Sequence, residues 1–386
     1  MTPSRLKLAA RLQGMGASKT LEITARAKAL VAKGYDVAIF AAGEPDFDTP
    51  EHICQAAIAA IKAGHTRYTA VAGIPELREA IARKFKLENG IDCDPGRVIV
   101  TTGGKQAIYN LLMAIVDPGD EVIIPAPYWN SYPAEVKLAG GIPVFVSTWP
   151  EGGYQINPQA IEKAMTPRTK AVILCSPCNP TGAVYEPKDI DAVAQACSDR
   201  GIYLVSDEIY EYIVYDAQVS SPARRFPDVS VTLNAVSKTY AMTGWRIGYA
   251  TGPQEVIDAM AAIQSQSTSN ATSIAQYAAL AALTGPPMEQ ARQIFRERRD
   301  LMVGGLNDLG LKTPLPQGAF YALADTRSID PSDVNAAQFL LSEAKVAAIP
   351  GSAFGAPGYM RFSYATDTTT IARGLERMRE ALRKRG

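Results

Sequence analysis

The residues with the clearest capacity for chemistry lie in residues 234–249, which read NAVSKTYAMTGWRIGY. Lys238 follows alternating apolar residues typical of a strand and precedes a second apolar run. A lysine between two strands either reaches solvent or is desolvated, and burial disfavours its ammonium form. A desolvated amine of lowered pKa can form a Schiff base. Ser237, Thr243 and Arg246 lie nearby in the sequence and could together bind a phosphate.

Further polar residues stand where other apolar runs end. Asp207 could either cap a helix or act as a buried carboxylate. Asn179 precedes Pro180, which is typical of a turn. Gly104 and Lys105 lie between a predicted strand and a predicted helix, where free N–H groups suit a tight turn or a phosphate. Neither GxGxxG nor GxxxxGKS/T occurs, so dinucleotide and P-loop sites lack their fingerprints.

A repeated alternation of strands and helices must position these residues. Short apolar runs occur at 98–100, 121–124, 142–146, 171–175, 202–205, 231–235 and 247–250. Helical patterns separate them, which predicts a mainly parallel α/β sheet covered on both faces. Ligands of such sheets bind beyond the carboxyl ends of the strands, where the polar residues above fall.

Helix signals and breaks divide the rest of the chain. Thr49, followed by Pro50 and an acid, predicts a helix start with Thr49 as its N-cap. A break at 284–287 precedes a long helix at 292–308, strands at 319–323 and 359–363, and a last helix. These elements predict a smaller C-terminal domain.

Composition excludes several functional classes. The 386 residues carry 39 basic and 39 acidic side chains, so the formal net charge is zero and nothing indicates nucleic-acid binding. No apolar run approaches membrane-spanning length and no signal peptide is present, so we expect a cytoplasmic protein. The chain has five cysteines, which argues against a disulfide framework, and the CxxC at 175–178 lacks the second pair that a zinc site needs. With two histidines, a general base must come from another residue type.

The stretch around Lys238 closely resembles the lysine motif of the class I/II aminotransferases of fold type I, which depend on pyridoxal 5'-phosphate (PLP). The likeness runs from GEPDF at 43–47 to MRFSY at 360–364 and is closest to bacterial aspartate and aspartate/prephenate aminotransferases. It implies a three-layer α/β fold with a seven-stranded sheet and a smaller α+β domain. It also implies an N-terminal segment (1–44) joining the small domain, a large PLP-binding domain (45–285) and a small domain (286–386).

The resemblance also implies roles for individual residues. Lys238 would hold the cofactor and move the proton, and Asp207 would pair with the pyridine nitrogen. The remaining implied cofactor contacts are Tyr210 and Asn179 on the ring oxygen, Trp129 on the ring face, Gly104, Lys105, Ser237 and Arg246, and Tyr68 from the neighbouring subunit of a homodimer. The implied substrate contacts are Arg361 on the α-carboxylate, Gly43, Trp129, Asn179, and Lys105, Ser18 and Thr20 on a distal carboxylate. No metal is expected.

Two departures from the family pattern affect these expectations. Ala235 stands where many relatives have a serine or threonine that binds the phosphate. Gly16 stands where the aspartate/prephenate subgroup has a lysine or arginine, which argues against prephenate as a substrate. The resemblance therefore favours ping-pong transamination between aspartate or glutamate and a 2-oxoacid. Alternatives on the same frame are an aminotransferase for aromatic or neutral amino acids, a carbon–sulfur lyase, and a non-catalytic PLP-binding regulator.

Overall fold

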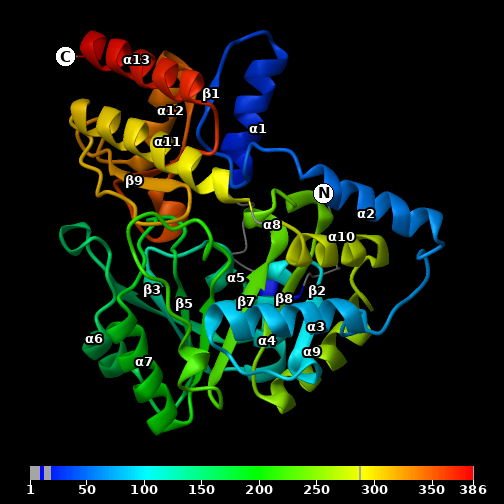
Figure 1. Ribbon diagram of the computed structural model, residues 1–386. Helices are drawn as coiled ribbons and strands as arrows, with labels where there is room; N and C mark the ends of the chain where they lie inside the picture. Colours follow the sequence, from blue (N-terminus) through cyan, green and yellow to red (C-terminus); the bar gives the residue numbers. More distant parts are fainter. Residues whose placement is uncertain (1–8, 13–18, 287, 386) are drawn as a thin grey trace, which may run out of the picture.

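A seven-stranded sheet forms the centre of the computed structural model, which describes residues 9–12, 19–286 and 288–385 (Figure 1). Its strand order is β2-β8-β7-β6-β5-β3-β4, and only β8 runs antiparallel to its neighbours. The strands are β2 (Val98–Thr101), β3 (Glu121–Ala126), β4 (Ile142–Ser147), β5 (Thr169–Cys175), β6 (Tyr203–Asp207), β7 (Ser230–Ala235) and β8 (Gly248–Thr251). Every strand expected from the apolar runs is present, which confirms the predicted mainly parallel sheet.

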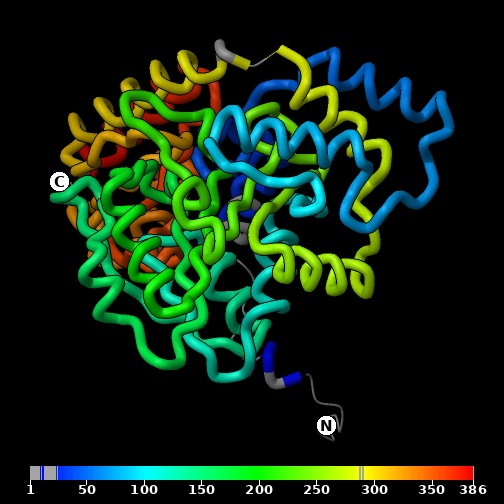
Figure 2. The backbone as a smooth tube through the Cα atoms, turned by 60° about the horizontal axis from the view of Figure 1, so that its bottom comes forward, coloured from blue at the N-terminus to red at the C-terminus, as the bar shows by residue number. Residues whose placement is uncertain are grey.

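Helices cover both faces of this sheet, as the apolar character of its strands requires. They are α2 (Glu51–Lys62), α3 (Pro75–Lys84), α4 (Gly104–Ile115), α5 (Ser131–Leu138), α6 (Pro158–Ala164), α7 (Pro187–Arg200), α8 (Val236–Thr239), α9 (Gln254–Ser267) and α10 (Ser273–Thr284). Val122 and Ile124 pack in the core beneath α4, α5 and α9, whereas Ile123 faces α6 and α7. Figure 2 shows α2 and α3 beside α10, with which they form a further core against β2 and β8.

A smaller unit follows α10. It contains α11 (Glu289–Asp308), β9 (Tyr321–Asp325), α12 (Asp333–Phe339), β10 (Val346–Ala347), β11 (Ile349–Pro350), β12 (Tyr359–Ser363) and α13 (Thr368–Arg385). Before the large sheet, α1 (Lys19–Ala32) lies beside this unit, and β1 (Ala38–Ile39) pairs with β10 (Figure 1). The pairing joins residues before position 44 to the C-terminal part of the chain. The domain boundaries at 44/45 and 285/286 stay predictions.

One local prediction is wrong. Thr49 does not cap α2: the N-cap residue is Pro50, without a side-chain cap, and the Thr49 hydroxyl instead donates to the Ala241 carbonyl at 2.7 Å. The Thr49 oxygen accepts a hydrogen bond from the Trp245 indole at 3.0 Å, so a long-range donor takes the place of the helix N–H. A separate prediction concerns membrane spans. Among the residues that the structure describes, no helix is long and apolar enough to cross a bilayer.

Candidate active site

A cavity of about 460 Å³ opens beyond the carboxyl ends of the central strands, and this volume lies in the range of small-molecule sites. Its walls bring together most of the residues expected from the sequence, drawn from segments that are far apart in the chain. These are Gly43, Gly104, Lys105, Trp129, Asn179, Asp207, Tyr210, Ser237, Lys238, Arg246 and Arg361.

Lys238 lies in α8, the single helical turn that follows β7. Its half-buried amine donates a hydrogen bond to the Gly43 carbonyl. Burial lowers the pKa of Lys238 to about 8, an effect that Arg361 and Arg246 reinforce and that Glu44 and Asp207 oppose. Near neutral pH, a much larger fraction of this lysine is therefore neutral and nucleophilic than is usual for a lysine.

Asp207 is the last residue of β6 and is 6% exposed. Its Oδ2 accepts a hydrogen bond from the Tyr132 hydroxyl at 2.6 Å, and its Oδ1 accepts one from the Ile209 N–H at 3.3 Å. Burial raises the pKa of Asp207, while these two donors and Lys238 oppose that rise. The residues after Asp207 form turns, so its alternative role as a helix N-cap is wrong.

Arg361 projects from β12 and is 3% exposed. It donates to Asn179 Oδ1 at 3.0 Å and to the Ala41 carbonyl at 3.1 Å, and its guanidinium lies 4.4 Å from the centre of the Tyr321 ring. Its Nε has no hydrogen-bond partner, and within the described residues no carboxylate pairs with it. Burial lowers the pKa of Arg361. A buried guanidinium without a counter-ion is suited to an anionic ligand.

Arg246 and two glycines form the corner of the cavity next to α8. Arg246 has φ +57° and donates to the Thr243 carbonyl at 2.8 Å. Gly103 has φ +79°, and a Cβ there would collide with the Arg246 guanidinium, so glycine is needed for this approach. Ala235 is the N-cap of α8 and supplies no side-chain cap, in keeping with the missing hydroxyl noted from the sequence.

The remaining wall residues complete the geometry. The exposed Lys105 amine lies 5.0 Å from the centre of the Trp129 ring. The buried Tyr210 hydroxyl lies 3.0 Å from that of Tyr321. Cys175 and Cys178 are free buried thiols.

One expected residue does not reach this cavity, and two others lie outside the description. Tyr68 is 89% exposed and does not line it. Thr20 lies in α1, and its side chain is outside the description, as are Ser18 and Gly16 altogether. The proposed distal-carboxylate contacts are therefore represented here by Lys105 alone.

Sequence reasoning missed Tyr132, Tyr321 and Asn234, all of which line the cavity. Tyr132 lies three residues after Trp129, so a helix starting near 130 would have placed both on one face. Tyr321 begins β9, and its contact with Tyr210 spans 111 positions of the sequence, which no local pattern reveals.

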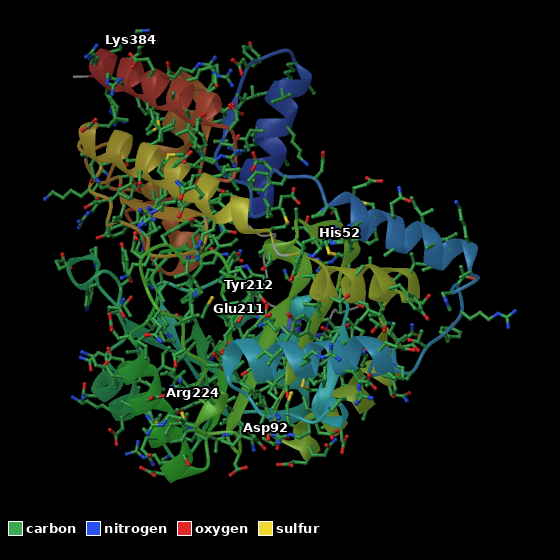
Figure 3. All side chains as sticks on the ribbon, viewed as in Figure 1. His52, Asp92, Glu211, Tyr212, Arg224 and Lys384 are labelled. Carbon is green, nitrogen blue, oxygen red and sulfur yellow. The ribbon has the colours of Figure 1, made fainter. Side chains whose placement is uncertain are left out.

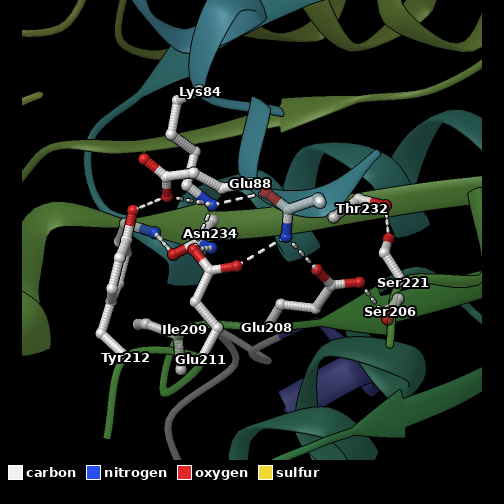
Figure 4. A network of polar contacts seen from close by, with 12 residues as sticks. Lys84, Glu88, Ser206, Glu208, Ile209, Glu211, Tyr212, Ser221, Thr232 and Asn234 are labelled. Atoms are coloured by element: carbon white, nitrogen blue, oxygen red, sulfur yellow. Dashed lines mark hydrogen bonds and ion pairs between the residues drawn. The ribbon is translucent and has the colours of Figure 1, made fainter. Parts of the chain in front are cut away.

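A second set of buried charges meets the cavity at Asn234, which lines it (Figure 4). This Lys84 cluster comprises Lys84, Asn89, Glu208, Glu211 and Asn234. Lys84 pairs with Glu211 and donates to Asn89 at 2.7 Å, and Asn89 donates to Glu211 at 2.6 Å and to Glu208 at 3.0 Å. Asn234 also donates to Glu211, at 2.6 Å. In Figure 3, Glu211 of this cluster lies near the middle of the molecule, in contrast to Lys384 of α13, which lies at its edge.

Known proteins of similar sequence and structure agree with this arrangement. The chain matches the family described as Aminotransferase class I and II over residues 35–378. The aspartate/prephenate aminotransferase of Thermus thermophilus is 50% identical over 380 residues, which cover 97% of this chain and 98% of that protein. The aspartate aminotransferase of Geobacillus stearothermophilus is 48% identical over 396 residues, which cover 98% and 100%.

A solved structure gives the same result in three dimensions. The aspartate aminotransferase from Thermus thermophilus with maleate has a TM-score of 0.95 at 50% identity, covering 97% of this chain and 100% of that one. The match extends over both the sheet and the smaller unit, and so over every segment that lines the cavity. The chain therefore belongs to the class I and II aminotransferase family, and it is a transaminase.

Proposed function

We propose that this enzyme transfers the amino group of aspartate or glutamate to a 2-oxoacid in two half-reactions, with pyridoxal 5'-phosphate as cofactor. The observation that carries the proposal is the meeting of Lys238, Asp207 and Arg361 in one cavity. A lysine of lowered pKa, a buried carboxylate and an unpaired buried guanidinium are the groups that an amine, a pyridine nitrogen and an α-carboxylate require.

The residues present fit this cofactor. Arg246, Ser237 and the backbone at Gly104 would bind its phosphate, in the corner that a side chain at Gly103 would fill. Trp129 would cover the ring, while Asn179 and Tyr210 would hold the ring oxygen. Asp207 would stabilise a proton on the ring nitrogen. When bound, the cofactor supplies an electron sink for the bond that breaks at the substrate Cα.

The protein itself binds and orients the substrate and moves the proton. Arg361 binds the α-carboxylate with the N–H donors that Asn179 and Ala41 leave free, and the Asn179 amide oxygen helps to fix the plane of the guanidinium. The neutral Lys238 amine would then move the proton from the substrate Cα to the C4′ carbon of the cofactor. One lysine serves as both base and acid because it stays within reach of both positions.

Acidic substrates are favoured by Lys105, whose exposed ammonium stands over Trp129 at the cavity wall. Relatives named aspartate aminotransferase and aspartate/prephenate aminotransferase occur at similar identity. Gly16 argues for the former, because a glycine offers prephenate no cation.

We also propose that the enzyme is a homodimer in which Tyr68 completes the neighbouring site. Tyr68 is 89% exposed, and a large aromatic side chain so exposed on one chain is typical of a residue that contacts a partner. A Tyr68→Phe variant should weaken cofactor binding without changing the Lys105-dependent preference for acidic substrates.

A half-reaction panel tests the proposed function. The PLP form is mixed with acidic, aromatic, basic and aliphatic amino acids, and the oxoacid and pyridoxamine phosphate produced are quantified. We expect aspartate and glutamate to react at least about tenfold more efficiently, and Lys105→Met to remove that advantage selectively. Ammonia and pyruvate in place of stoichiometric oxoacid would instead identify a carbon–sulfur lyase.

A further inference from the structure

The hydroxyl of Tyr132 makes the shortest contact to the carboxylate of Asp207. Tyr132 lies in the first turn of α5, is 2% exposed, and donates to Asp207 Oδ2 at 2.6 Å. Such a distance is typical of a hydrogen bond between a neutral hydroxyl and an ionised carboxylate. The contact joins α5 to the end of β6 across 75 positions of the sequence.

The proton of this hydrogen bond belongs to Tyr132. Burial raises the pKa of the Tyr132 phenol well above its usual value, so the phenol stays a donor throughout the working pH range. Burial also raises the pKa of Asp207, and Tyr132 is the largest effect opposing that rise. Without this hydroxyl, desolvation would favour the neutral form of the acid.

Few other groups act on Asp207. Lys238 on α8 favours its ionised form, and the Ile209 N–H does so from the following turn. Glu135 on α5 and Cys175 on β5 also lie within electrostatic reach. Glu135 is 6% exposed, its Oε2 has no hydrogen-bond partner in the described residues, and burial raises its pKa to about 8. Glu135 is therefore mostly uncharged at pH 7 and adds little negative charge near Asp207.

We propose that Tyr132 is a positioning residue, whose hydroxyl keeps Asp207 ionised and aimed so that it can hold a proton on the ring nitrogen of the bound cofactor. This inference rests on the proposed function. The Tyr132 ring packs edge-on against Trp129, with centroids 5.4 Å apart. One side chain therefore contacts both Asp207, which would hold the proton of the cofactor nitrogen, and Trp129, which would cover the face of the cofactor ring.

This role predicts an effect that depends on the ring nitrogen. A Tyr132→Phe variant keeps the aromatic ring in place and removes only the donor. A cofactor analogue with C–H in place of the ring nitrogen, 1-deazapyridoxal 5'-phosphate, has no proton there for Asp207 to hold. The hydroxyl should therefore matter for pyridoxal 5'-phosphate and matter little for the analogue.

The test measures dissociation constants of both compounds for the apoenzymes of the parent, Y132F and E135Q at pH 7. The parent should bind pyridoxal 5'-phosphate more tightly than the analogue. Y132F should weaken pyridoxal 5'-phosphate binding about tenfold and analogue binding less than twofold, since a hydrogen bond to a charged group is lost only in the first case. E135Q, in the same helix one turn later, should leave the ratio of the two constants within twofold of the parent.

Both compounds are titrated into one preparation, so an unfolded fraction affects both constants equally and cancels in their ratio. Acidification gives a second readout: binding of pyridoxal 5'-phosphate by Y132F should fail at a higher pH than in the parent, because Asp207 is protonated sooner. Equal losses for both compounds, or an unchanged ratio, would overturn the role of Tyr132. A parent enzyme that does not distinguish the two compounds would instead refute the proposed partnership of Asp207 with the ring nitrogen.

Discussion

Two sets of charged residues in this enzyme meet at Asn234, and they differ in how their hydrogen bonds are used. In the Lys84 cluster, the Lys84 ammonium pairs with Glu211 and donates to Asn89, and both amides point toward carboxylates. In the cavity, Lys238 donates to the Gly43 carbonyl, and Arg361 Nε has no hydrogen-bond partner among the residues that the structure describes. Buried charges that satisfy one another make the fold sensitive to the loss of either partner, whereas those left partly unsatisfied mark the site of a ligand.

The largest expected effect comes from replacing the lysine of the cavity. In the proposed mechanism, Lys238→Ala removes both the cofactor attachment and the proton carrier, so kcat should fall at least about 10⁴-fold. The melting temperature should change by no more than a few degrees, because the half-buried amine makes no ion pair within the described residues. Steady-state kinetics and thermal unfolding of the same preparation check both parts. Turnover near the parent rate would remove Lys238 from the mechanism.

Replacing the lysine of the cluster should produce the reverse pattern. Lys84→Met leaves the Glu211 carboxylate buried without its cation, which costs about 3 kcal/mol of unfolding free energy or more. Once folded, the enzyme should keep kcat/KM within about threefold, since Lys84 does not line the cavity. Denaturant unfolding and kinetics test this. If stability were unchanged while activity collapsed, the distinction between the two regions would fail.

Two buried arginines, Arg361 in the cavity and Arg299 outside it, allow the same comparison between a residue that awaits a ligand and one that is already paired. Arg361→Lys loses the paired donors that we propose bind the substrate carboxylate, so kcat/KM for aspartate should fall about 100-fold. Arg299 is equally buried, but it already pairs with Asp216 and Asp300 and donates to the Pro316 carbonyl. Arg299→Lys is thus the matched control and should lower stability while leaving kcat/KM within about threefold. Similar kinetic losses in both variants would contradict our assignment of Arg361.

The smallest expected effect concerns pH. Burial and the neighbouring Glu211 raise the pKa of Glu208 to about 7. The folded state therefore keeps a proton that the unfolded state releases near its ordinary pKa of 4.5, and this stabilisation is lost as pH rises through 7. Glu208→Gln removes the loss, so its stability relative to the parent should rise by about 2 kcal/mol between pH 5 and pH 8. A difference that stays constant with pH would show that Glu208 does not titrate in this range.

The lining residues of the cavity could be predicted from the sequence better than the side-chain contacts around them, for a physical reason. Asp207, Asn179 and Lys238 follow apolar runs, and parallel strands bring their carboxyl ends to one edge, so local patterns suffice to group them. The roles of these residues came from the family resemblance and stay predictions.

Contacts between distant segments were beyond such reasoning. The hydroxyl of Tyr132 meets Asp207 only because α5 packs over the sheet, and the Lys84 cluster joins α3 to residues after β6. Thr49 was expected to cap its own helix but hydrogen-bonds to Ala241, which lies 192 positions away. Side-chain partners of this kind depend on tertiary packing, which hydrophobic periodicity does not encode.

The central claim is that Lys238, of all the lysines in this chain, attaches to the cofactor. Borohydride treatment of the enzyme loaded with pyridoxal 5'-phosphate, followed by proteolysis and mass spectrometry, identifies the attached residue. We expect one cofactor per chain, on the peptide that contains Lys238. Label on Lys105 or Lys84, with Lys238 unmodified, would contradict the account.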